Sequence, residues 1–484
     1  MRKKRIRQDS PGPHTNWAKT SLFGIENNHD LGLAAKVNMI LHGDGSMSTF
    51  VTSGLLSFDH YEIPGRPTIL KEQKRGNKKL NEQFDLVISN PPFSIKLSDD
   101  DKREVRKAFS GDLGLSEELF IERWYQLLSP GGLFCCVLPE SICDTSKEAK
   151  TRRWLFERFH IKAVVSLPYL TFQPYTSVKT CVVLAEKRTE KERKKVSAVL
   201  NGLTRCSDIA DIRALFKTHK LEDEPIFMAE PEQVGYKRRK GLSDLPRPTD
   251  LPQVVASFRG DLEEETLKHG FFITLADVLS RQKLRIDPKY CWLWYKQRGE
   301  IMVRGYGEYQ PLSTWLSVVD LRKIQKGPLD GPSLLVDLEA VQPRSGRITN
   351  GIAFEVEEIG SDKVSFEGAD IVFAKLEPYL AKIIIRPDQS AIGSTEWVGL
   401  KCAEGSDPLS VGYMLMLPQL REAYHCLKSG KRQARLDIKE MLELEVDVNP
   451  KTADAGNIES VLKRINTLER QIEEARISID DLFL

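Results

Sequence analysis

The chain has 484 residues, of which 40% are hydrophobic and 29% are charged. This length and composition predict a soluble globular protein with two or three domains, each able to bury a core. The net charge of +2 excludes a uniformly basic surface, so any nucleic-acid-binding surface would have to be local. The sequence contains no apolar stretch of the length that a membrane span or signal peptide needs, which predicts a cytoplasmic location.

The eight cysteines indicate reduced thiols instead of a disulfide framework. They form no CxxC pairs and no metal-ligand spacing, so no metal site is expected. Cys135 and Cys136 lie inside the apolar run 133–138, where buried thiols are the expected state.

In chain order, residues 1–20 are basic and contain two prolines, and we expect a disordered arm there. A short strand at 21–26 ends in Glu26, and a helical pattern from Leu31 follows and ends at Gly43. The next clear strand covers 84–89 and leads directly into Asn90.

From residue 116 to 187, helical and strand patterns continue to alternate. Ser116 can cap a helix that Pro130-Gly131-Gly132 ends, and a helix is expected around 152–159. The expected strands are 133–138, 161–167 and 179–185. The alternation predicts an α/β fold with a Rossmann-like, mainly parallel, doubly wound sheet and ligands at the carboxyl ends of its strands.

Asn90-Pro91-Pro92-Phe93 is the most informative motif, because it follows a predicted buried strand. In several enzymes an Asn-Pro-Pro-aromatic loop holds a planar amino group while a methyl group is delivered to it, and the amino group of adenine is such a group. The lone pair of adenine's amino nitrogen is delocalised into the ring, so the amine is a poor nucleophile. The Asn90 side-chain oxygen and the Pro91 carbonyl can accept its two hydrogens, and fixed acceptors of this kind contribute roughly 3–4 kcal/mol each. The prolines stiffen the loop, and Phe93 would stack on a flipped base. The alternative is an ordinary rigid turn.

Five segments in register resemble the modification subunits of type I restriction-modification systems, over about residues 21–187. They are 23–26, 36–45, 90–93, 138–140 and 167–168. The resemblance implies adenine-N6 methylation of DNA with S-adenosylmethionine. It also implies that Glu26 binds the cofactor's ribose hydroxyls, and that the loop 172–176 lies across the base pocket.

The chain departs from that family in its cofactor-binding segments. The Asp-Pro-x-x-Gly-x-Gly loop that precedes the acid in the family is not found upstream of Glu26, and Gly43-Asp44-Gly45 follows a helix and so lacks the context of a cradle. Ser53 stands where related enzymes carry an aspartate that contacts the cofactor's adenine, and a hydroxyl binds more weakly than a carboxylate. These departures predict very weak S-adenosylmethionine binding by this polypeptide alone.

Residues 188–270 carry charge runs at 187–195 and 237–240 and a proline cluster just beyond the second. They favour a charged connector around one small helical piece. The alternative is a strip that contacts phosphates along the path of the DNA.

Residues 271–455 resemble an α+β target-recognition domain of type I specificity subunits, through the segments 370–382, 393–397 and 429–436. The basic residues that could reach phosphates or guanine edges are Lys375, Lys382, Lys431, Arg432 and Arg435. Lys375 and Lys382 could equally be charges that protect an edge strand from aggregation.

Residues 456–484 carry apolar side chains at alternating spacings of three and four, which is a heptad pattern. The positions are Ile458, Val461, Ile465, Leu468, Ile472, Ala475, Ile479 and Leu482. A long coiled-coil-like helix is expected, which would pair two chains or bind a specificity or modification subunit. The alternative is an amphipathic helix packed on its own domain.

Together these features predict a site-specific adenine-N6 DNA methyltransferase that binds double-stranded DNA and needs a separate polypeptide for the cofactor loop. Two alternatives stay open. The chain could be a catalytically inactive DNA-binding fragment, which would explain Ser53. It could also be a protein glutamine methyltransferase, which uses a similar Asn-Pro-Pro loop, although Phe93 takes the place usually held by tyrosine.

Overall fold

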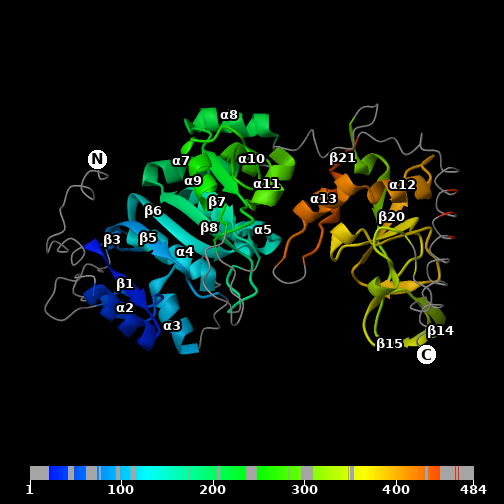
Figure 1. Ribbon diagram of the computed structural model, residues 1–484, viewed down its shortest axis with the longest axis horizontal. Helices are drawn as coiled ribbons and strands as arrows, with labels where there is room; N and C mark the ends of the chain where they lie inside the picture. Colours follow the sequence, from blue (N-terminus) through cyan, green and yellow to red (C-terminus); the bar gives the residue numbers. More distant parts are fainter. Residues whose placement is uncertain are drawn as a thin grey trace. The chain divides into compact units, whose positions relative to one another are not determined.

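The computed structural model describes most of the chain in two compact units, Met1–Leu284 and Arg285–Leu484 (Figure 1). The described residues are 21–41, 48–61, 73–75, 78–93, 99–110, 116–169, 171–173, 175–203, 208–235, 248–281, 283–295, 309–346, 348, 354–430, 434–446, 460, 464 and 467. The arm expected at 1–20 lies outside them.

The first unit is built on a mixed sheet of six strands in the order β10-β9-β7-β8-β6-β5. Its helices and strands are β1 Gly24–Glu26, α2 His29–Leu41, β2 Thr49–Val51, β3 Gln73–Arg75, β4 Lys78–Leu80, β5 Phe84–Ser89, α3 Asp99–Ala108, α4 Ser116–Leu127, β6 Leu128–Pro139, α5 Ser141–Asp144, α6 Ala149–Arg158, β7 Phe159–Ser166, β8 Thr180–Lys187, α7 Glu190–Gly202, α8 Ile209–His219, β9 Pro225–Ala229, α9 Leu251–Arg259, β10 Phe271–Thr274 and α10 Leu275–Leu279.

The α/β fold is confirmed, but the expectation of a mainly parallel sheet is wrong. β5 runs parallel to β6, and β7 runs parallel to β9, whereas β8 is antiparallel to both β6 and β7 and β10 is antiparallel to β9. The reason is local. β8 follows β7 through the connection 167–179 without a crossover helix, so it returns in the opposite direction.

Local sequence chemistry explains the boundaries of several elements. α7 begins with a capping box, in which Thr189 accepts the amide of Glu192 and Glu192 accepts the amide of Thr189. α8 ends at Lys220, which adopts the left-handed conformation with φ 51°. In β6, buried and half-buried side chains alternate from Leu133 onward, because successive side chains of a strand point to opposite faces of the sheet.

The expected connector 188–270 and the domain boundary at 271 are corrected by this arrangement. β9 lies inside 188–270 and β10 begins at Phe271, and both belong to the six-stranded sheet, while the contact boundary falls after Leu284. The charged residues 190–195 of the first run lie on α7, and the second run, 237–240, lies outside the described residues. β9 has only five residues, which is too short to be recognised as a strand from the sequence pattern.

β1 and β2 form a separate parallel pair that does not continue the six-stranded sheet. Phe50, Phe58 and Tyr61 form a small buried cluster there, against which Ile25 and Val87 pack. The rings of Phe23 and Phe84 meet edge to face, with centroids 5.5 Å apart. The pair is therefore attached to the main sheet through side chains, and a hairpin of β3 and β4 lies nearby in sequence.

The second unit is α+β, as expected, with a four-stranded sheet in the order β12-β20-β17-β18 and a five-stranded sheet in the order β13-β16-β19-β14-β15. Its elements are α11 Pro288–Tyr295, β11 Gln310–Pro311, β12 Leu316–Val319, β13 Lys323–Ile324, β14 Gly327–Leu335, β15 Phe354–Ile359, β16 Lys363–Ser365, β17 Ile371–Ala374, the 3₁₀ helix η6 Pro378–Leu380, β18 Ile383–Ile385, β19 Ile392–Ser394, β20 Trp397–Cys402, α12 Pro408–Leu415, α13 Pro418–Leu427, α14 Ile438–Leu442 and β21 Glu445–Val446.

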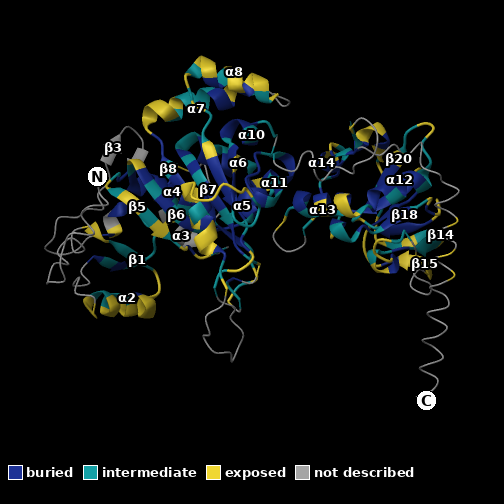
Figure 2. Cartoon of the chain, turned by 45° about the horizontal axis from the view of Figure 1, so that its top comes forward, coloured by how far each residue is buried: buried dark blue, intermediate teal, exposed yellow. Residues whose placement is uncertain are grey.

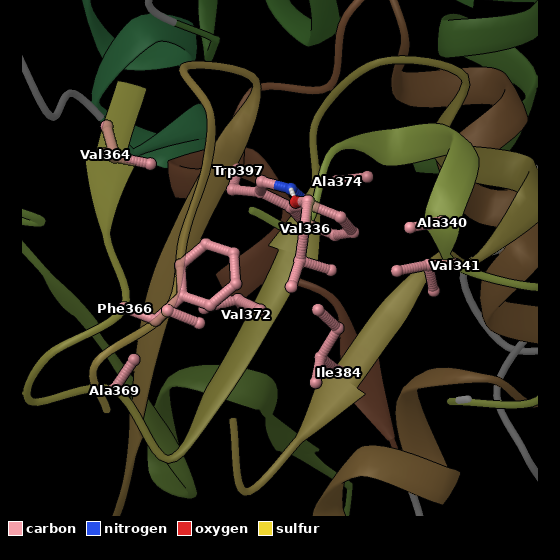
Figure 3. Close-up of a cluster of buried hydrophobic side chains, with 11 residues drawn as sticks. Val336, Ala340, Val341, Val364, Phe366, Ala369, Val372, Ala374, Ile384 and Trp397 are labelled. Atoms are coloured by element: carbon pink, nitrogen blue, oxygen red, sulfur yellow. Dashed lines mark hydrogen bonds between the residues drawn. The ribbon is translucent and has the colours of Figure 1, made fainter. Parts of the chain in front are cut away.

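Trp397 is central to the core of this unit (Figure 3). Its indole N–H donates to the carbonyl of Val336 at 3.0 Å, which satisfies the only polar atom of a side chain that is 2% exposed. Phe366 packs against it edge to face, and Val372 and Ile384 contribute from the neighbouring strands β17 and β18.

The apolar positions of the expected heptad lie outside the described residues, so their pairing stays a prediction. Ser460, Arg464 and Thr467 are described, and each is helical and exposed. Among the described residues, no helix has both the length and the apolar character needed to cross a membrane.

Substituting Gly270 tests the placement of β10 in the first unit. Gly270 has φ +132°, and an added Cβ would lie 2.1 Å from the ring of Phe227, which is in β9. We expect Gly270→Ala to lower the free energy of unfolding by about 3 kcal/mol or more, through backbone strain plus overpacking. Gly260→Ala is the control, because φ is +80° with open space around it, and it should cost about 1–2 kcal/mol. Equal urea midpoints for the two variants would contradict the packing.

Candidate active site

Four strand ends meet at one edge of the six-stranded sheet. β5, β6, β7 and β9 all run in the same direction, as their parallel pairings and the antiparallel β8 between β6 and β7 require. The residues that follow them directly are Asn90, Glu140, Leu167 and Glu230. This edge therefore gathers polar groups where ligands of α/β sheets bind.

The Asn90 loop presents an available amide on a stiff support. The side chain of Asn90 is exposed, and within the described part of the chain no hydrogen bond reaches it. Pro91 is buried and fixes the backbone behind it, while Phe93 is half-buried. The loop leaves the amide oxygen of Asn90 free to accept a hydrogen from a ligand.

A buried ion network lies at the neighbouring strand ends. The Lys179 ammonium is 3.1 Å from a carboxylate oxygen of Glu140 and 2.7 Å from one of Glu230. The hydroxyl of Ser166 donates to the other oxygen of Glu140. Burial lowers the pKa of Lys179, but the two carboxylates more than offset this, so its pKa lies above the ordinary value of 10.5. The network ties the ends of β6, β7 and β9 to the start of β8.

The connection between β7 and β8 borders this network and carries two exposed aromatic rings. Tyr169 is 51% exposed and Tyr175 is 77% exposed. The Thr171 hydroxyl donates to the Pro168 carbonyl at 2.7 Å, and Thr176 accepts the Val178 amide at 3.1 Å. Internal bonds therefore shape the loop while its rings stay at the surface.

The two residues expected to bind the cofactor lie together beside the β1–β2 pair. Glu26 ends β1, and one of its carboxylate oxygens accepts the amide of Asn28 at 2.7 Å. The amide of Thr52 donates to the Glu26 carbonyl at 2.9 Å, which brings Ser53 close to the acid. The Ser53 hydroxyl accepts the amide of Leu55 at 3.3 Å, so it already serves its own loop.

These residues fit only part of an S-adenosylmethionine site. Glu26 keeps one carboxylate oxygen without a described partner, which suits a ribose hydroxyl. Ser53 supplies no charge for an adenine contact. In the described residues, no glycine-rich turn follows a strand at this edge in the way a phosphate or methionine cradle requires.

β5 is exposed in a way that is unusual for an edge strand. Leu86 and Ile88 point to one face and are 52% and 76% exposed, while Val87 packs into the cluster on the other face. Apolar residues on both faces are typical of interior strands. Within the described residues β5 pairs with β6 alone.

Helix α2 is largely exposed (Figure 2), and its exposed residues include several large apolar ones. Leu33, Val37 and Leu41 line an open hollow of about 490 Å³ on it. Leu33 and Val37 are 54% and 49% exposed, and Leu41 is 79% exposed. Exposed apolar surface of this kind marks interaction sites. Next to it, Gly32 allows α2 to lie against β2, since a Cβ there would be 2.8 Å from Val51.

Of the five residues of the second unit that were expected to contact DNA, the structure describes three, and two of these are bonded to other protein groups. Arg435 is engaged by the carboxylate of Glu396 at 2.6 Å, and Lys375 adds to the positive charge around that carboxylate. Lys382 donates to the carbonyl of Leu338 at 2.7 Å. Lys431 and Arg432 lie outside the described residues. The structure therefore brings Lys375 and Arg435 together but ties Lys382 to the protein.

Sequence reasoning missed Lys179, Ser166 and Glu230 as members of the site. Lys179 directly precedes β8 and Glu230 directly follows β9, so position at a strand end was the available signal. It was lost because the segment of β9 was assigned to a connector. No group of three or more His, Cys, Asp or Glu side chains in the described residues is placed to hold a metal.

Removing the Lys179 charge should destabilise the first unit. Lys179→Met removes the ammonium that lies between two largely buried carboxylates, so we expect a loss of about 3 kcal/mol in unfolding free energy near neutral pH. The raised pKa means that the contribution is fully present below 10.5 and is lost as the pH rises through the folded-state value. The gap between parent and variant should therefore narrow in strongly alkaline solution.

Lys162→Met is the matched control, since Lys162 lies 3.0 Å from Glu186 but the two side chains are 31% and 40% exposed. A screened pair of this kind is expected to contribute about 0.5 kcal/mol or less. Chemical denaturation of the three proteins across the pH range measures both effects. Similar losses in the two variants would show that the network at the sheet edge has no special role.

Known proteins resemble the amino-terminal half of the chain. Residues 3–224 match the family model of N-6 DNA methylases. The EcoEI methylase subunit of Escherichia coli is 26% identical over 172 residues, which are 34% of this chain and 30% of that protein. The MpnII methylase subunit of Mycoplasma pneumoniae is 26% identical over 188 residues, 36% of this chain and 32% of that protein.

Among solved structures, the methyltransferase subunit of a type I restriction-modification system from Streptococcus thermophilus is 19% identical. It covers 53% of this chain and 45% of its own, with a TM-score of 0.33. The shared stretch thus spans about a third of the two curated relatives named above. On the family match and these relatives, residues 3–224 are similar to N-6 DNA methylases, among them the methylase subunits of type I restriction enzymes.

Proposed function

We propose that this chain transfers the methyl group of S-adenosylmethionine, the cofactor of N-6 DNA methylases, to the N6 nitrogen of an adenine flipped out of double-stranded DNA. The observation that carries the proposal is the Asn90 amide. It is exposed and unpaired within the described residues, follows a sheet strand, and lies inside the N-6 DNA methylase segment.

The chain's own groups suffice to bind and orient the adenine amine. The Asn90 side-chain oxygen and the Pro91 carbonyl accept its two hydrogens, which favours a tetrahedral nitrogen with an available lone pair. Phe93 offers a face for stacking the extruded base. No general base is required before transfer, because the proton leaves the nitrogen after the new bond forms.

The loop between β7 and β8 supports the other wall of the base pocket. Its exposed rings, Tyr169 and Tyr175, lie on the segment that follows β7, at the same sheet edge as Asn90. The network of Glu140, Lys179 and Glu230 holds this edge in place. Flipping costs a few kcal/mol, which aromatic stacking and contacts to the DNA backbone must offset.

A separate polypeptide completes the cofactor side of the site. Three features of the described residues support this: one carboxylate oxygen of Glu26 has no partner among them, β5 has exposed apolar residues at an edge that none of them pairs with, and α2 has an exposed apolar surface. A strand added beside β5 would cover Leu86 and Ile88 and satisfy the backbone groups of that edge.

The second unit acts as the target-recognition domain in this proposal. Its α+β build and the basic residues Lys375 and Arg435 support it, while Lys431 and Arg432 extend the basic sequence beyond the described residues. The helix at 458–482 would pair two chains, or bind a specificity or modification subunit, and so bring a second recognition domain to the DNA.

One observation favours a second candidate, a catalytically inactive DNA-binding protein. The Ser53 hydroxyl is engaged by the amide of Leu55 in its own loop, so it is a poor substitute for a carboxylate that contacts the cofactor. Transfer by the parent chain under any of the conditions below would eliminate this candidate.

Replacing Asn90 tests the catalytic assignment. We expect Asn90→Ala to lower the rate of tritiated methyl transfer to DNA by about 100- to 1000-fold, because one fixed acceptor of the amine is removed. Asn201→Ala is the control, since Asn201 lies on α7 and accepts from Arg153 at the surface. Reactions with and without a separate polypeptide that carries the cofactor loop, and with DNA or protein as acceptor, separate the candidate functions. Equal incorporation by parent and Asn90→Ala would end the assignment.

Titration calorimetry tests the incompleteness of the cofactor site. We expect the purified chain alone to bind S-adenosylmethionine more weakly than about 100 μM, since Glu26 is its main polar contact and each lost charge-assisted bond costs about 1.5–3 kcal/mol. Glu26→Gln should weaken the residual binding further. Micromolar affinity of the unaccompanied chain would refute this prediction.

A further inference from the structure

We propose that Arg344 and Arg421, with the exposed face of α13, form a binding site for consecutive phosphates of the DNA backbone. The inference rests on the proposed function in one respect, the choice of DNA as the ligand. It adds residues that the sequence motifs did not indicate, and it assigns them to backbone contact instead of base recognition.

Helix α13 places Arg421 and His425 along one face, and Lys428 follows directly after its last residue. Arg421 and His425 are spaced by four residues, which aligns them on consecutive turns. The opposite face is buried through Leu420, Ala423, Tyr424 and Leu427. Glu422 is adjacent in sequence to Arg421 but points elsewhere around the helix, because residues i and i+1 do not face each other.

A turn with left-handed residues holds Arg344 beside the amino end of α13. Arg344 has φ 63°, and its amide donates to the carbonyls of Leu380 at 3.1 Å and Ala381 at 3.4 Å. Gly346 has φ +70°, and a Cβ there would lie 2.9 Å from the Cε atom of Met416, which directly follows α12. The turn is therefore packed closely against the segment that leads into α13.

The two arginines lie near each other without a neutralising carboxylate. In the described part of the chain, neither guanidinium takes part in an ion pair, and the Nε atom of Arg421 is buried without an acceptor. Burial and the neighbouring Arg344 cation lower the pKa of Arg421. Two such cations repel each other, and an anion bound between them would relieve the repulsion and satisfy the unused donors.

Two other exposed cations of the unit already have carboxylate partners. Arg386 pairs with Asp407 at 2.6 Å, and Lys401 pairs with Asp370 at 2.8 Å. These residues are neutralised on the protein, so they have less to gain from a phosphate. Arg344 and Arg421 differ from these two paired cations, and the buried Nε of Arg421 adds a donor without an acceptor in the described residues.

The far end of the face is built around Tyr379. Its ring lies edge to face with His425 at 5.5 Å between centroids, and the Lys428 ammonium lies 4.8 Å from its centre. Glu377 and Ala381 flank the turn with φ 48° and 44°, a strained conformation for residues other than glycine. Such strain is kept where a side chain must be held in one place, and here the side chain is that of Tyr379, which contacts His425 and Lys428.

The cationic face is therefore elongated, from Arg344 through Arg421 to Lys428, and the sequence continues into Lys431 and Arg432. Lys289 adds a further ammonium, 3.3 Å from His425. A line of cations matches the repeated phosphates of one DNA strand better than a single small anion. Contacts of this kind position the protein on the duplex without reading its sequence.

The test measures binding of the full chain to a labelled random duplex over a series of salt concentrations. Each phosphate contact contributes about 0.9 to the slope of log affinity against log salt. The double variant R344Q/R421Q should lower that slope by about 2 and weaken binding at low salt by about tenfold or more. R386Q and K401Q are the matched controls and should keep the parent's slope.

The charge-conserving double variant R344K/R421K separates charge from folding, and it should keep the parent's slope and most of its affinity. If R344Q/R421Q binds with the parent's slope, the inference fails and the proposed function stands. If the slope falls equally in R344K/R421K, the arginines are structural, and the inference fails as well. If the parent binds no duplex even at low salt, both the inference and the proposed function are overturned.

Discussion

The edge of β5 is the constraint on which this account depends. A strand with apolar residues on both faces is built to lie inside a sheet, yet β5 pairs only with β6 among the described residues. The Asn90 loop continues from this strand. The groups that would bind the adenine amine are therefore positioned by a strand whose second edge has no pairing strand among the described residues. The rigidity of Pro91 and the ion network around Lys179 stabilise one side of the site. The cofactor side depends on what covers β5 and α2.

The second unit distributes its charge in a way that separates two roles. Arg435 forms an ion pair with Glu396, and Lys375 interacts electrostatically with the same carboxylate. Arg386 and Lys401 are paired with aspartates. Arg344 and Arg421 are left without such partners in the described residues. Local cationic surface of this type reconciles DNA binding with an overall net charge of only +2.

The sequence predicted the elements with strong periodicity and missed those defined by pairing. α4 begins near the expected position and β5 covers Phe84–Ser89 as expected, because polar and apolar patterns are local signals, but β5 is largely exposed where a buried strand was expected. The antiparallel course of β8 and the membership of β9 and β10 in the sheet depend on contacts between distant segments, which no local pattern encodes. The same distance hid Glu230, and it hid Arg344, whose amide bonds to the carbonyl of Leu380 far along the chain. Asn90 could be identified from the sequence because the motif that indicates its role consists of four consecutive residues.

The central claim is methylation of adenine at N6, and single-molecule sequencing of DNA tests it most directly. The chain would be expressed, together with a polypeptide that carries the cofactor loop, in a bacterium that lacks its own adenine methylation. The account predicts N6-methyladenine at one recurring sequence motif across the genome, and none when Asn90 is replaced by alanine. Unmodified adenines throughout, in cells that contain the folded chain, would contradict it.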